Sequence, residues 1–81
     1  MNNSELMREK LVRLRIRQTN LEIEAKGLAR DIPPLINPTL QAVIDMDVAV
    51  AAGKMDELIM HQGELLKIRG QIWDLEEALG Q

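Results

Sequence analysis

Two long stretches of this 81-residue sequence place mostly apolar side chains at alternating spacings of four and three. In the first stretch these positions are Met7, Leu11, Leu14, Gln18, Leu21, Ala25 and Leu28. In the second they are Leu58, His61, Leu65, Ile68, Ile72, Leu75 and Leu79. Such spacing puts all members of a set on one face of an α-helix and is typical of coiled-coil-like packing. We therefore expect an all-α fold with two long helices.

The first helix is expected over residues 4–30, with Ser4 as its N-cap. A proline-rich linker is expected to follow over residues 31–37. Pro33 and Pro34 each lack a backbone donor, and each disfavours the helical conformation in the residue before it. The sequence therefore predicts that this linker is not helical.

A second, shorter helix is expected over residues 38–52, with Asn37 as N-cap and Pro38 at its first position. It is apolar almost all round, through Leu40, Val43, Ile44, Met46, Val48 and Val50. A helix of that composition is normally buried. The last helix is expected over residues 54–79, and Gly53 is interpreted as a break between the two, although the helical register continues across it.

The apolar content is large for so short a chain. Of its residues 46% are hydrophobic, none is cysteine and the net charge is −3. A domain of this size buries only about 60% of its unfolded surface, and without disulfides it is commonly stabilised by association. We therefore expect residues 1–81 to form one helical domain, a small bundle of two long helices and one shorter buried helix that is completed by homo-oligomerisation, as a homodimer or larger.

The charges of the first helix suggest how two copies would pair. Cations flank the apolar face in its first half and anions in its second half. In an antiparallel pair Arg15 meets Glu22 of the other copy, and Arg17 meets Glu24. The expected self-association residues are Met7, Leu11, Leu14, Gln18, Leu21, Leu28, Arg15, Arg17, Glu22 and Glu24. The alternative is pairing within the chain, with the acidic residues Asp74, Glu76 and Glu77 accepting the cations.

Apolar residues also occur outside these two faces. Val12, Ile16 and Ile23 lie roughly opposite the apolar face of the first helix, and Ile59, Leu66 and Trp73 form a row beside that of the last helix. Three aligned apolar side chains indicate a second contact. We expect these six residues to form a surface for a partner protein.

Binding to nucleic acid is the less favoured alternative. The first helix carries a basic cluster of Arg8, Lys10, Arg13, Arg15 and Arg17, which offers phosphate contacts. The chain is acidic overall, however, and no aromatic residue lies near the cluster to stack on bases.

Metal binding and catalysis find weaker support. Glu57, His61 and Glu64 share one helical face, but a histidine on an apolar face is more often a hydrogen-bonded core residue. No hydroxyl or thiol nucleophile lies near His61, and no glycine-rich loop is present to hold phosphate. We expect no metal, no cofactor and no enzymatic activity.

The sequence predicts neither a signal peptide nor a membrane span, and a cytoplasmic location is expected. Residues Ala52–Leu58, followed by a long amphipathic helix, resemble the last hairpin of flagellar export chaperones. No residue role is carried over from that resemblance. The function expected from the residues is a non-enzymatic protein-interaction module, such as a small adaptor, export-type chaperone or inhibitor.

Overall fold

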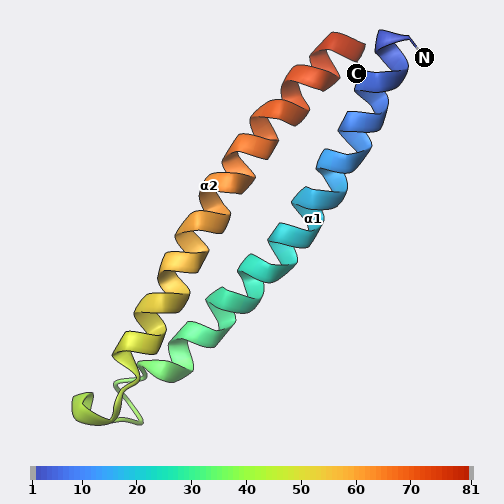
Figure 1. The fold of residues 1–81 in the computed structure, drawn as a ribbon. Helices are drawn as coiled ribbons and strands as arrows, with labels where there is room; N and C mark the ends of the chain where they lie inside the picture. The colour runs from blue at the N-terminus through green and yellow to red at the C-terminus, as the bar shows by residue number, and fades with distance from the viewer. Residues whose placement is uncertain (1, 81) are drawn as a thin grey trace.

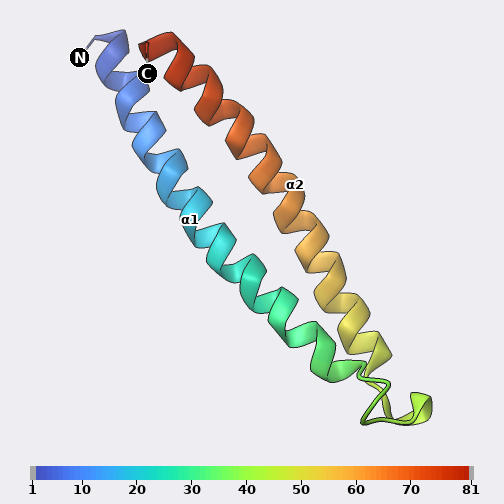
Figure 2. The same ribbon diagram turned by 180° about the vertical axis from the view of Figure 1, so that it is seen from behind.

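The computed structural model describes residues 2–80. Helix α1 (Asn3–Leu35) and helix α2 (Val48–Leu79) are joined by a loop that contains a short 3₁₀ helix, η1 (Val43–Asp45). The two long helices lie side by side and antiparallel, so that both ends of the chain are at the same end of the molecule (Figures 1 and 2). The result is a rod of 61 × 17 × 14 Å. The expectation of an all-α fold with two long helices is confirmed, and the residues described contain no strand.

The core is a single layer between the two helices. Leu11 of α1 and Ile68 and Ile72 of α2 are its buried centre, and Leu14, Leu21, Leu75 and Leu79 pack around them. Towards the loop, Ala25, Ile32 and Ala51 are also buried. The apolar faces expected from the spacings of four and three are therefore the faces that meet.

Helix α1 differs from its expected bounds at both ends. Asn2, rather than Ser4, is the N-cap, and its Oδ1 accepts a hydrogen bond from the Glu5 amide at 2.9 Å. At the other end the helix includes Pro33 and Pro34 and ends at Leu35, so the expectation of a non-helical linker over residues 31–37 is wrong.

The reason lies in contacts made by the last turns of α1. Both prolines lie in its final turn, and their fixed φ suits a helix. Ile32 is buried against α2, and the Leu35 carbonyl accepts a hydrogen bond from the Asp47 amide at 3.0 Å. These contacts outweigh the local preference against helix before each proline.

The expected buried helix over residues 38–52 is also wrong. Asn37 does begin a turn, since its Oδ1 accepts from the Thr39 amide and its carbonyl accepts from the Gln41 amide, both at 3.0 Å. The turn does not continue as an α-helix. Leu40, Val43 and Ile44 are 81%, 77% and 92% exposed, because a two-helix hairpin provides no third layer against which the loop could pack.

Helix α2 begins at Val48 and runs unbroken through Gly53, which corrects the interpretation of that glycine as a break. A glycine inside a helix costs about 1 kcal/mol relative to alanine. The α2 residues on either side of Gly53 that face α1, buried Ala51 and half-buried Lys54, keep the helical register. The helix ends at Leu79, and Gly80 is its C-cap: the Gly80 amide donates to the carbonyls of Glu76 and Glu77, and its positive φ of 73° turns the chain out of the helix.

Candidate interaction surfaces

The self-association residues expected on α1 face α2 of the same chain. Leu11 is only 2% exposed, and Met7, Leu14, Gln18, Leu21 and Leu28 are half-buried. The apolar face of α1 is therefore covered by α2, and a second copy could reach it only if the hairpin opened.

The four charged residues expected to pair between copies each have a partner within the chain. Arg15 Nη2 lies 2.8 Å from Glu76 Oε1, and Arg17 Nη2 lies 3.2 Å from Glu64 Oε1. Glu22 pairs with Lys26 one turn further along α1, at 3.7 Å. Of the acceptors expected for pairing within the chain, only Glu76 takes a cation, whereas Arg17 pairs with Glu64, which was not among them. Exposed pairs of this kind contribute about 0–1 kcal/mol each, so they select the antiparallel register more than they stabilise it.

Glu24, the fourth of these residues, joins the helices through His61. Its Oε2 lies 3.0 Å from His61 Nε2, and His61 Nδ1 lies 2.8 Å from the Glu57 carbonyl. Because both partners are acceptors, both hydrogen bonds form only when each ring nitrogen carries a proton. The hydrogen bond to Glu24 and that to the Glu57 carbonyl raise the pKa of His61 above its usual value near 6.5.

This arrangement also bears on the metal hypothesis. His61 points to Glu24 of α1 and Glu64 pairs with Arg17, so the side chains of the expected triad are directed to different partners. No group of three or more His, Asp or Glu side chains within residues 2–80 is placed to hold a metal ion. What His61 and Glu24 provide chemically is a charged link between α1 and α2.

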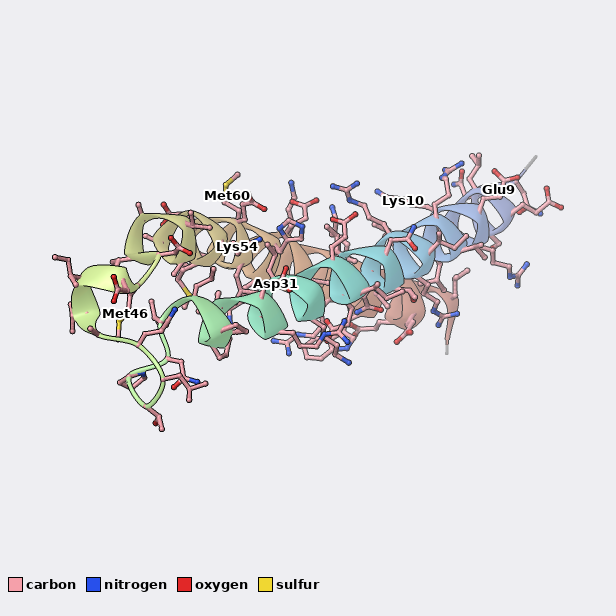
Figure 3. All side chains as sticks on the ribbon, turned by 90° about the horizontal axis from the view of Figure 1, so that it is seen from below. Glu9, Lys10, Asp31, Met46, Lys54 and Met60 are labelled. Atoms are coloured by element: carbon pink, nitrogen blue, oxygen red, sulfur yellow. The ribbon has the colours of Figure 1, made fainter. Side chains whose placement is uncertain are left out.

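A further ion pair joins the helices near the loop. Lys54 Nζ of α2 lies 3.6 Å from Asp31 Oδ2 of α1, and Figure 3 shows the two side chains between the helices. Together with the contacts that Arg15, Arg17 and His61 make, this ion pair places charged contacts between α1 and α2 along most of the hairpin.

The six residues expected to form a partner surface are all exposed. Their exposed fractions lie between 54% and 62%, for Val12, Ile16, Ile23, Ile59, Leu66 and Trp73. They form two rows, one on the outer side of each helix. Over the Trp73 ring lies the guanidinium of Arg69, 5.1 Å from its centre, a geometry that favours a cation–π contact.

A shallow groove joins parts of these rows on one face of the hairpin. One end is lined by Gln18, Thr19, Glu22, Ile23, Lys26, Gln62, Leu65, Leu66 and Arg69. The next section shares Glu22, Lys26, Gln62 and Leu65 with it and continues to Ala25, Ala29, Met55, Leu58 and Ile59. Sequence reasoning missed this groove, because it depends on which flanks of the two helices meet. Knowledge of the antiparallel pairing would have placed Ile23, Ile59 and Leu66 on the same face.

The basic cluster of α1 is divided by the hairpin. Arg15 and Arg17 pair with carboxylates of α2, whereas Arg8, Lys10 and Arg13 are exposed and form no ion pair with the residues described. Lys10 and its neighbour Glu9 project from α1 near its N-terminal end (Figure 3). Three of the five cations of the cluster therefore remain available for phosphate contacts within the described part of the chain.

Among residues 2–80, neither helix has a segment apolar enough to cross a membrane. Comparison of the chain with protein-family models, with curated proteins and with solved structures finds no match.

Proposed function

We propose that this protein is a non-enzymatic interaction module, of the kind that serves as a small adaptor, export-type chaperone or inhibitor, and that it acts as a homo-oligomer. The observation that carries the proposal is the pair of apolar rows on the outer sides of α1 and α2. All six side chains are more than half exposed although they are apolar. Contiguous apolar surface on a small protein commonly marks a protein–protein contact.

The surface area of the chain supports the same proposal. It exposes 6062 Å², whereas a compact protein of 9.2 kDa exposes roughly 4,900 Å² by the usual scaling of area with mass. The difference, about 1,100 Å², exceeds the roughly 800 Å² that each partner buries in a standard protein–protein interface.

The thin core also favours association. Among residues 2–80, the only buried apolar residues are Leu11, Ala25, Ile32, Ala51, Ile68 and Ile72. A single layer between two helices provides little burial to offset the conformational entropy of ordering them. Packing of Ile59, Leu66 and Trp73 against another helix would add to the buried apolar surface.

Light scattering tests the proposal directly. At high micromolar concentration we expect twice the mass of the chain or more, and Ile59→Ser with Leu66→Ser should return it to that of the monomer. Ile44→Ser is the matched control, because Ile44 is 92% exposed but lies in the loop. A monomer mass for the unaltered protein would contradict the proposal of a homo-oligomer.

Binding to nucleic acid is the alternative function, and it can be measured on the same protein. If the exposed Arg8, Lys10 and Arg13 bind phosphate, DNA or RNA binding should weaken steeply as salt is raised. Binding of that kind by a monomeric chain would favour a nucleic-acid-associated regulator. We expect no binding at low salt.

A further inference from the structure

The two faces of the hairpin differ in how charged side chains join α1 to α2. Arg17, Glu24 and Asp31 follow one another at intervals of seven, so they lie on one flank of α1, and each contacts an ionisable side chain of α2. The shallow groove lies on the other flank, where α1 lines it with Glu22 and Lys26. Within residues 2–80, no residue that lines the groove joins the two helices through an ion pair. One face is therefore closed by charged contacts, and the other is open.

The open groove is apolar along its middle and positively charged at its edges. Ile23 of α1 and Ile59 and Leu66 of α2 line it and are more than half exposed. Towards the loop it continues past Lys26 to Arg30 and Pro33. Its charged residues are three cations and one carboxylate, namely Lys26, Arg30, Arg69 and Glu22. The groove is thus positive, although the chain as a whole has a net charge of −3.

Two of these cations have no carboxylate partner in the described part of the chain. Lys26 pairs with Glu22, whereas Arg30 and Arg69 are exposed and form no ion pair within residues 2–80. Arg30 Nε donates a hydrogen bond to the Lys26 carbonyl at 3.3 Å, and the Arg69 guanidinium lies over the Trp73 ring. Both guanidiniums therefore retain donors for a carboxylate from outside the chain.

We propose that this groove binds an acidic amphipathic helix of a partner protein. The inference rests on the proposed interaction function and names the kind of partner that the groove takes. A helix laid between α1 and α2 would bury its apolar face on Ile23, Ile59 and Leu66 and complete a three-helix bundle. Its carboxylates would meet Arg30 and Arg69, which supply the charge complementarity that selects an acidic partner.

The positions of the two arginines set the length of the partner helix. Arg69 lines the end of the groove that also includes Thr19, and Arg30 lies eleven residues further along α1. At 1.5 Å per residue the two ends of the groove are about 16 Å apart. A helix of about three turns spans that length, with apolar residues in its middle and a carboxylate towards each end. Because the groove uses Ile59 and Leu66, the partner helix and a second copy of the chain would compete for it.

Two designed helical peptides of about 18 residues test the proposal on the unaltered protein. Both carry leucines at helical spacings of three and four; the flanking positions hold glutamate in one peptide and lysine in the other. The glutamate peptide should bind at least about tenfold more tightly, and its affinity should fall as salt is raised. The net charge of −3 alone would favour the lysine peptide. Fluorescence anisotropy of the labelled peptides measures both affinities.

Charge reversal locates the binding. Arg30→Glu with Arg69→Glu should weaken binding of the glutamate peptide at least about tenfold and strengthen that of the lysine peptide. Arg8→Glu with Arg13→Glu is the matched control, because it changes the net charge equally at two exposed arginines that do not line the groove. It should have a much smaller effect on either affinity.

The possible outcomes separate this inference from the proposed homo-oligomer. A lysine peptide that binds as tightly as the glutamate peptide would overturn the acidic partner, and so would equal effects of the two double variants. If neither peptide binds and light scattering shows a dimer that Ile59→Ser with Leu66→Ser disrupts, a second copy is the occupant; the acidic partner is then overturned and the homo-oligomer stands. A monomeric chain that prefers the glutamate peptide would support the acidic partner and overturn the homo-oligomer.

Discussion

Truncation of Ile68 tests whether the single layer between α1 and α2 holds the hairpin together. Ile68 is 1% exposed and lies with Leu11 and Ile72 at the centre of the core. Ile68→Ala removes three carbon atoms, worth about 0.8 kcal/mol each in lost burial, and leaves a cavity. The expected loss in free energy of unfolding is therefore about 2.5–4 kcal/mol. A chain of this length is stable by roughly 4–12 kcal/mol, so the change removes a large share of the total.

Urea unfolding followed by far-ultraviolet circular dichroism measures this loss. The chain should be kept at low micromolar concentration, where unfolding reports the monomer. Ile59→Ala on the same helix is the matched control, because Ile59 is 58% exposed and its truncation should change stability by no more than about 0.5 kcal/mol. Equal effects of the two substitutions would refute the assignment of the core to the α1–α2 face.

Two further predictions concern particular residues. Because the partners of His61 raise its pKa in the folded chain, its contribution to stability is complete below the unfolded pKa near 6.5 and is lost as pH rises through the folded pKa. The urea concentration at the unfolding midpoint should therefore decrease as the pH is raised from 5.5 to 8.5, and His61→Gln should make that decrease smaller. A variant with the same pH dependence as the unaltered chain would contradict the link between His61 and Glu24. Gly53→Ala should raise the free energy of unfolding by about 0.5–1 kcal/mol, since the added Cβ meets nothing within 4 Å, and a decrease would indicate that α2 does not run through residue 53.

The two long helices were predictable because their signal is repeated many times. Residues from Leu11 to Leu28 and from Leu58 to Leu79 keep one spacing over several turns, and no single residue decides the outcome. In the structure these faces supply the core residues Leu11, Ile68 and Ile72. Local sequence and tertiary packing agree there.

The junction between the helices was not predictable, because tertiary contacts override local preference. Pro33 and Pro34 disfavour helix locally, but burial of Ile32 and the hydrogen bond from Asp47 to Leu35 hold the last turn of α1 in place. The apolar run with Leu40 and Val43 indicated a buried helix, although burial requires a third layer that the hairpin lacks.

The self-association face illustrates a different limit of sequence reasoning. Spacing and charge identify a helix face that packs, but they do not say whether its partner is in the same chain. Arg15 can pair by charge with Glu22 of a second copy or with an acidic residue of its own chain, and in the structure it pairs with Glu76. The six residues of the outer rows are exposed in the structure, and their role as a surface for a partner protein stays a prediction.

The spacing between two copies of residue 53 is the most direct test of the central claim. The chain has no cysteine, so Gly53→Cys carries a single spin label, at a position with open space around it. If two copies associate through the outer rows, the labels should show an intermolecular distance whose contribution grows with protein concentration. Pulsed electron paramagnetic resonance measures that distance. The absence of any intermolecular distance at high concentration would contradict self-association.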